Sequence, residues 1–169
     1  MHITLDMLER LAACSQQRSL FNRLFPNGTD VTVELCEQHS DRFDWQWAAE
    51  NFLTEESALV EYDNLTDAAL TEYGNVSSAA QEKYIESTAT ATAEYDAVVG
   101  AARTEYYKVP HRTSWPTYDK ALEVAHQKHR LAVAPAKAEY DNVCVAAQAV
   151  YYKVCAAAWA KAFLSQHER

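Results

Sequence analysis

The sequence contains only three glycines among its 169 residues, and no two of them lie close together. A phosphate-binding loop and a dinucleotide-binding turn each need several glycines at fixed spacing, so neither motif is present. The chain also lacks the Gly-x-Ser-x-Gly turn that positions a hydrolase nucleophile. We therefore predict that the protein is not an enzyme and that it holds no cofactor.

Long hydrophobic runs and paired cysteines are missing as well. No stretch of 18 apolar residues occurs, and the start MHITLDMLERL carries acidic residues where a signal peptide would be apolar. The four cysteines include no Cys-x-x-Cys pair. Cys144 and Cys155 would lie about 16 Å apart along one helix, too far for a disulfide. These features predict a cytoplasmic protein with reduced thiols and no membrane partner.

The chain does contain a regular repeat of 11 residues, marked by tyrosine. Its positions are Tyr62, Tyr73, Tyr84, Tyr95 and Tyr106, and then, after a break, Tyr118, His129, Tyr140, Tyr151 and Ala162. Three helical turns in 11 residues correspond to about 3.67 residues per turn, slightly more than in a straight helix. The pattern predicts long, nearly straight helices with at most a weak right-handed supercoil.

The apolar seam of the first repeat helix is expected to follow the steps 3, 4 and 4, through Tyr62, Leu65, Ala69, Tyr73, Val76 and Ala80. Alanine allows two helix axes to approach closely, and tyrosine supplies a large ring with a polar tip. We interpret the tyrosine ladder as core packing between helices. A ladder that stacks a ligand or nucleic-acid bases is the open alternative.

Changes in composition divide the chain into residues 1–53, a helical module, and residues 54–169, a long hairpin. Thr54 is the expected N-cap of a helix over about 55–109. Pro110 and Pro116 predict a turn over 110–116, followed by a helix over about 117–165. Pro135 should kink the second helix because it lacks a backbone N–H. The predicted fold class is all-α.

Charge predicts that the two long helices pair with each other. Residues 54–109 carry a net charge of −8, whereas residues 110–169 carry +3 and residues 1–53 carry −4. An acidic helix joined by a short turn to a basic one favours an antiparallel hairpin. A bundle formed between separate chains is the competing arrangement, so the expected state is a monomer or a small homo-oligomer.

The N-terminal module should consist of four short helices. Its first helix is expected from about Leu5 to Ala13, and Ser15, Thr32 and Asp44 are the expected N-caps of the other three. Residues 26–30 form a predicted turn, and a short strand at 31–33 is a further expectation. Because such a unit is too small to be very stable alone, we expect it to pack against the base of the hairpin.

Part of the sequence resembles a known family. Residues 11–53 resemble an N-terminal module that recurs in proteins of phages and of bacterial genomes carrying prophages. The residues that carry the resemblance are Ala13, Cys14, Gln17, Leu20, Phe21, Phe25, Pro26, Gly28, Asp44, Trp45, Trp47, Ala48 and Ala49. Those proteins often continue with Ala-Pro-Ala-x-Ala-Glu-Tyr repeats, and APAKAEY at 134–140 is similar. The resemblance implies a phage or mobile-element origin but no defined activity.

Candidate functional residues are acidic or aromatic. The acidic candidates for partner binding on the first long helix are Glu61, Asp63, Asp67, Glu72, Glu82, Glu86, Glu94, Asp96 and Glu105. They form either a solvated face or a mimic of nucleic acid. A charge of −8 over roughly 80 Å is far sparser than one charge per about 1.7 Å in duplex DNA. The aromatic and tip candidates are Trp45, Trp47, His111 and Trp115.

Two histidines give a third, weaker hypothesis. His126 and His129 are spaced i, i+3 on the second helix, with Glu123 one turn away, so they are able in principle to share a metal ion. His129 also occupies the tyrosine position of the repeat. We therefore interpret it as a seam aromatic and His126 as a surface residue, and we predict no metal site.

These observations predict a non-enzymatic interaction protein of phage or prophage origin. Its expected partner is a protein or complex of the bacterial host, and inhibition of a CRISPR or restriction system is the expected kind of activity. Direct nucleic-acid binding is not expected, because the overall charge is negative. The alternative is a self-assembling coiled-coil structural or virion-associated protein.

Overall fold

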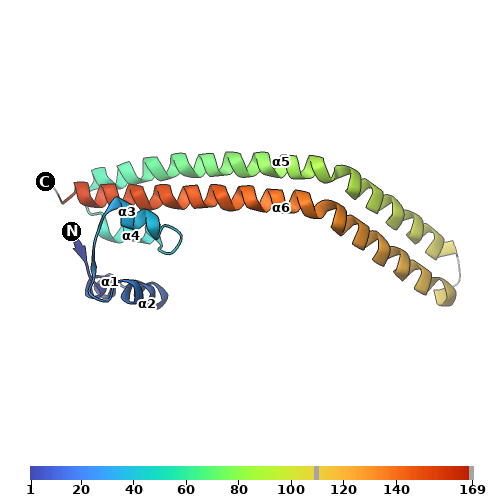
Figure 1. Cartoon of the computed structure of the whole chain (residues 1–169), viewed down its shortest axis with the longest axis horizontal. Coiled ribbons are helices and arrows are strands. Elements are labelled where there is room, and N and C mark those ends of the chain that lie inside the picture. Colours follow the sequence, from blue (N-terminus) through green and yellow to red (C-terminus); the bar gives the residue numbers. More distant parts are fainter. Residues whose placement is uncertain (109–110, 168–169) are drawn as a thin grey trace. The chain divides into compact units, whose positions relative to one another are not determined.

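In the computed structural model, the described residues are 1–108 and 111–167, without the side chains of 111–115. The elements are β1 (His2–Ile3), α1 (Leu5–Arg10), α2 (Ser15–Leu24), β2 (Thr29–Asp30), α3 (Val33–Gln38), α4 (Trp45–Phe52), α5 (Glu56–Lys108) and α6 (His111–Ser165) (Figure 1). The all-α prediction is confirmed. The chain forms two compact units: the first contains Met1–Asn75 and Ala146–Arg169, and the second contains Val76–Val145.

Side-chain caps define where most of the short helices begin. Thr32 accepts a hydrogen bond from the backbone N–H of Leu35, and Asp44 accepts one from that of Trp47, as expected from the sequence. The expected cap at Ser15 is wrong. Ser15 is already the first residue of α2, and the cap position is held by Cys14, whose side chain makes no capping bond.

The small sheet pairs β1 with β2 in antiparallel register, with His2 opposite Asp30 and Ile3 opposite Thr29. The strand expected at 31–33 lies two residues earlier, because Thr32 caps α3 and Val33 begins it. Gly28 precedes β2 with a φ of +78°. A Cβ at this position would lie 2.5 Å from His2 Nε2 and 2.6 Å from the Ile3 carbonyl oxygen, so the turn requires glycine.

Helices α5 and α6 run antiparallel to each other (Figure 1). The aromatic rings of the repeat meet between the two helices. In the first unit the ring centroids of Tyr73 and Tyr151 lie 6.1 Å apart. In the second unit the corresponding distances are 5.8 Å for Tyr84 and Tyr140, 5.1 Å for Tyr95 and His129, and 5.0 Å for Tyr106 and Tyr118. The predicted hairpin and the interpretation of the ladder as packing are therefore confirmed.

One position of the predicted seam of α5 is wrong. The tyrosine and alanine positions are buried or partly buried as predicted, and Val76 is partly buried as well, but in the first repeat Thr66 is buried instead of Leu65, and Thr88 is buried at the same repeat position. Leu65 remains 42% exposed, whereas Thr66 is buried and its hydroxyl donates to the backbone carbonyl of Tyr62. A residue four positions after the tyrosine lies about 40° from it around the helix, and one three positions after lies about 60° away. The residue four positions after the tyrosine therefore faces α6 more directly than the residue three positions after it. This direction decides that Thr66 is buried, although Leu65 is more apolar.

The predicted turn at 110–116 is also wrong over most of its length. Helix α6 begins at His111, while residues 109–110 lie outside the described residues. Pro116 and Pro135 are both inside α6, which continues through each of them as one helix. Each proline removes a single intrahelical hydrogen bond, and the bonds on either side, together with packing against α5, maintain the helix.

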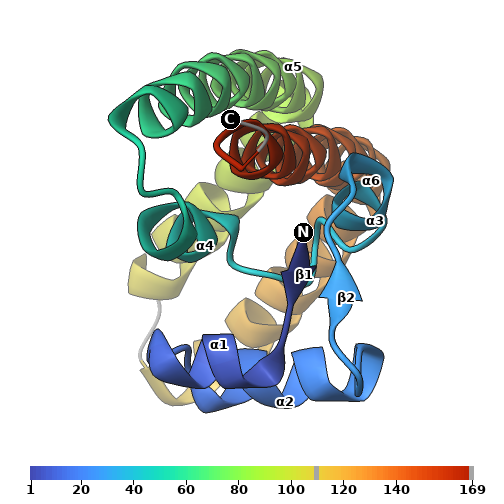
Figure 2. The ribbon, with the colours of Figure 1, turned by 90° about the vertical axis from the view of Figure 1, so that its left-hand side faces the viewer.

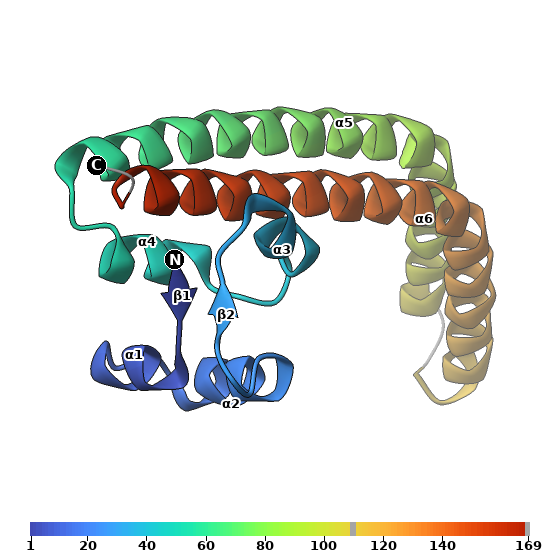
Figure 3. The ribbon, with the colours of Figure 1, turned by 60° about the vertical axis from the view of Figure 1, so that its left-hand side comes forward.

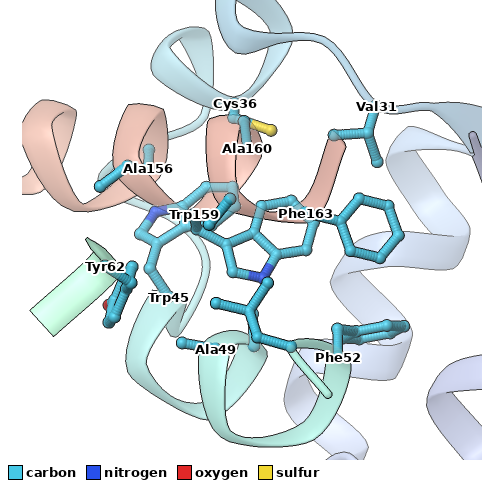
Figure 4. Close-up of a cluster of buried hydrophobic side chains, with 14 of the residues drawn as sticks. Val31, Cys36, Trp45, Ala49, Phe52, Tyr62, Ala156, Trp159, Ala160 and Phe163 are labelled. Atoms are coloured by element: carbon cyan, nitrogen blue, oxygen red, sulfur yellow. The ribbon is translucent and has the colours of Figure 1, made fainter. Parts of the chain in front are cut away.

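The main core lies in the first unit and joins the N-terminal module to the beginning of α5 and to the end of α6 (Figure 4). Trp159 of α6 packs against Trp45 and Phe52 of α4, with ring centroids 5.4 and 6.2 Å apart. Phe163 stacks on Trp159 at 5.1 Å, and Tyr62 of α5 is 1% exposed. Figures 2 and 3 show α4 lying beside the C-terminal part of α6. The expected packing of the module on the hairpin is confirmed.

Candidate functional site

The second unit has a shallow groove that follows the line between α5 and α6, and we call it the hairpin groove. One stretch of it is lined by Val76, Ala79, Ala80, Lys83, Tyr84, Ser87, Ala136, Glu139, Tyr140 and Val143. The next stretch is lined by Ala91, Glu94, Tyr95, Val98, Ala125, Lys128, His129 and Ala132. Most residues of the second stretch lie 11 positions from a residue of the first. The groove therefore repeats along the hairpin with the same 11-residue period as the sequence.

An ion pair crosses each stretch of the hairpin groove, and the two pairs have opposite polarity. Lys83 Nζ lies 2.6 Å from Glu139 Oε1, whereas Lys128 Nζ lies 2.8 Å from Glu94 Oε2. The hydrogen bond with Glu139 raises the pKa of Lys83, and the hydrogen bond from Lys128 lowers the pKa of Glu94. Because the pairs are exposed, they add little stability, but the alternating polarity specifies which repeats face each other.

Apolar side chains stand exposed along the hairpin groove. Val98 is 47% exposed on α5, and Val143 is 36% exposed on α6. An apolar strip flanked by charges is the kind of surface that binds the apolar face of an amphipathic helix.

The structure brings only some of the nine acidic candidates for partner binding to the same side of α5. All nine side chains are exposed. Glu61, Glu72, Glu94 and Glu105 share one repeat position of α5, which Lys83 also occupies, and of these glutamates only Glu94 lines the hairpin groove. Asp63 and Asp96 lie two residues further on, about 200° around the helix, and therefore face the other side. Glu94 is paired with Lys128, and Glu105 with Lys108 in its own helix at 2.7 Å. The remaining acidic candidates, which belong to neither group, are Asp67, Glu82 and Glu86.

The aromatic candidates are placed differently from one another. Trp45 is buried, and its indole Nε1 donates to the Ser40 carbonyl at 2.8 Å, so it belongs to the core. Trp47 is half-buried and packs its ring edge-on against Phe52 at 6.0 Å. The side chains of His111 and Trp115 lie outside the described residues.

The two histidines of the metal hypothesis both contact the ring of one tyrosine. The ring centroid of Tyr95 lies 5.1 Å from those of both His126 and His129. The Tyr95 hydroxyl is hydrogen-bonded to His126 Nε2 at 2.6 Å, and Thr92 Oγ1 lies 3.4 Å from His129 Nε2. Among the described residues, no group of three or more histidine, cysteine or acidic side chains is arranged to hold a metal ion.

Helix α6 contains an apolar stretch that the sequence analysis did not anticipate. Within Pro116–Ser165, an 18-residue window reaches a mean hydropathy of 1.3 with at most two charged residues, and 28% of that window is buried. By length and composition alone, this is the one helix of the described residues that is long and apolar enough to cross a membrane.

Comparison with known proteins gives no relative for this chain. No protein-family model, no curated protein and no solved structure matches it. Function must therefore be argued from the geometry of the hairpin groove and of the aromatic core.

Proposed function

We propose that this protein is a non-enzymatic interaction protein whose hairpin groove binds an amphipathic helix of a partner protein. The observation that carries the proposal is the recurrence of the same shallow groove, with exposed apolar side chains and one ion pair across it, at two successive repeats of the second unit. Because the charges at the groove are already paired across it, the partner helix is expected to contact the groove mainly through apolar side chains.

The resemblance of residues 11–53 to a module of phage and prophage proteins supports a bacterial protein or complex as the partner. Modulation of a host defence complex, such as a CRISPR or restriction system, agrees with a small acidic protein of this kind. In this proposal the protein acts by occupying a protein surface of the complex, and it does so in the host cytoplasm without binding nucleic acid itself.

A capture experiment with matched variants tests the proposal. Val98→Lys places a charge on the exposed rim of the hairpin groove, whereas Ala97→Lys places the same charge one residue, about 100°, away. Both positions are exposed on α5, so both variants should fold. A true partner in bacterial lysate should be retained by wild type and by Ala97→Lys and be lost with Val98→Lys. Equal retention by both variants would contradict the proposal.

A second candidate function, self-assembly, is favoured by the period of the groove. A helix that fits successive stretches must itself repeat every 11 residues, and α5 and α6 of a second copy do so. Light scattering on the purified 19.1 kDa chain distinguishes the two functions. A monomer in solution would favour binding of a partner protein over self-assembly. A dimer that Val98→Lys converts to monomer and Ala97→Lys does not would make self-assembly the function.

A further inference from the structure

The first unit contains a partly open cavity of about 80 Å³, lined by the N-terminal module and by Trp159 of α6. Its wall is largely aromatic and includes Phe21, Phe43, Trp45, Phe52 and Trp159. These rings form a continuous chain of tilted and edge-on contacts, with neighbouring centroids between 5.4 and 6.5 Å apart. Protein interiors are normally packed with few voids of this size, so the cavity calls for a physical explanation.

One wall residue has a hydrogen-bonding group with nothing to bind. Trp159 is 3% exposed, and its indole Nε1 has no acceptor. Trp45, the neighbouring tryptophan of the wall, donates instead to the Ser40 carbonyl. In Figure 4 the indole nitrogen of Trp159 is turned towards α4, which supplies Trp45 and Phe52 to the wall. Because buried N–H groups are almost always paired, this N–H needs an acceptor that a ligand or a water would supply.

A second wall residue repeats the observation. Nδ1 of His39 is also buried without a partner. The ring of His39 is held edge-on by Phe25 at 5.5 Å and by Phe43 at 6.4 Å. Two polar atoms without partners therefore belong to side chains that line one apolar cavity.

The remaining wall offers little to a charged ligand. The carboxylate of Asp44 already accepts the backbone N–H of Trp47 as a helix cap. Burial raises the pKa of the Cys36 thiol, another wall residue, to about 12, so this thiol stays neutral. A charged group would lose its hydration here without a counter-charge.

We propose that this cavity binds a small uncharged organic molecule with an apolar body and one oxygen that accepts a hydrogen bond from the indole N–H of Trp159. Its volume is about half the 150 Å³ that accommodates benzene, so the bound group is smaller than a benzene ring. Trp47 and Phe43 line the cavity and are only half-buried, so a longer molecule is able to insert its end from their side.

The test compares two small probes that differ in their ability to accept a hydrogen bond. Propanone has an acceptor oxygen, whereas dichloromethane is of similar size and has none. Nuclear magnetic resonance of the indole N–H groups follows both titrations on the full chain. Propanone should move the Trp159 indole signal downfield in a saturable way and bind about tenfold more tightly than dichloromethane.

Two variants complete the experiment. Trp159→Phe removes the donor, so the preference for propanone should disappear while dichloromethane still binds. Ala48→Leu adds volume from α4 into the cavity wall, so both probes should lose their binding even if Trp159→Phe fails to fold. Equal affinity for both probes in wild type, or a Trp159 N–H bonded to an ordered water that propanone does not displace, would overturn the proposal.

Discussion

Tyr62 differs from the other repeat tyrosines because the core of the first unit surrounds it. Burial raises the pKa of Tyr62 far above its ordinary value. Burial, together with a hydrogen bond to Cys155, raises the pKa of Tyr151 to about 12. Tyr107, by contrast, is 68% exposed on the same helix as Tyr62.

These tyrosines should limit stability at alkaline pH. A tyrosine whose pKa is higher in the folded state stabilises the fold below the unfolded value of about 10. That contribution is lost as the pH rises through the folded value, near 12 for Tyr151. Unfolding measured by circular dichroism should therefore begin above pH 10, together with the ionisation of the buried tyrosines at 295 nm.

A matched pair of substitutions checks this interpretation. Tyr62→Phe removes the most strongly shifted group and should move the alkaline midpoint to higher pH. Tyr107→Phe should leave the midpoint unchanged. A common shift in both variants would mean that the alkaline transition depends on total charge and not on the buried tyrosines.

Residue patterns in the sequence were sufficient to place the tyrosines and alanines of the seam but not the residue between them. Leu65 is more apolar than Thr66, and the sequence alone gives no reason to prefer the threonine. The threonine can be buried because its hydroxyl donates to a carbonyl of its own helix. Lys83 occupies a repeat position that is glutamate in the other repeats of α5. This reversed charge in the sequence indicates an acidic residue opposite it on α6, and Glu139 is that residue.

At the scale of the element, two glycines weaken α5 without serving a visible purpose. A Cβ added at Gly74 or at Gly100 meets no atom within 4 Å. Gly74→Ala and Gly100→Ala should therefore each stabilise the unit that contains them by about 1 kcal/mol. Denaturant titration measures the gain, and a loss at either position would show that α5 needs its local flexibility.

Gly28 provides the contrast. Alanine at this position would adopt an unfavourable φ and would approach His2 and the Ile3 carbonyl too closely. Gly28→Ala should therefore destabilise the first unit in the same titration. The sequence predicted the turn, but not the close approach of β1, since that contact joins residues 25 positions apart.

The boundaries of the elements were predictable where a side chain caps a helix and less so where proline was the signal. Asp44 and Thr32 mark helix starts in both the sequence and the structure. Pro110 and Pro116 suggested a turn that ended too late. Proline disfavours a helix locally, whereas the continuous seam with α5 stabilises it over many residues, and the second effect is the larger one here.

At the scale of the whole molecule, burial is distributed unequally between the two units. Among the described residues of the second unit, only Thr88 and Ala125 are buried. The first unit contains the aromatic core and all the other buried residues of the described chain. We expect the second unit to unfold at a lower temperature than the first.

This expectation has a direct spectroscopic test. Three of the four tryptophans, Trp45, Trp47 and Trp159, belong to the first unit. In a Trp115→Phe background, fluorescence should report the first unit alone, while circular dichroism reports helix in both. The dichroism should decrease in two steps, with only the second step visible in fluorescence. A single coincident transition would show that the chain unfolds as one cooperative body.

The alternating ion pairs have a consequence for how such a hairpin changes length over evolution. Each step of 11 residues along α5 is matched by an equal step back along α6. If the repeat containing Lys83 were deleted alone, Glu94 would face Glu139. If the repeat containing Glu139 were deleted with it, every ring would keep a ring opposite and every charge its counter-charge. The hairpin is therefore expected to change length only by one repeat of α5 together with the facing repeat of α6. Relatives that fold should differ in chain length by such pairs of repeats.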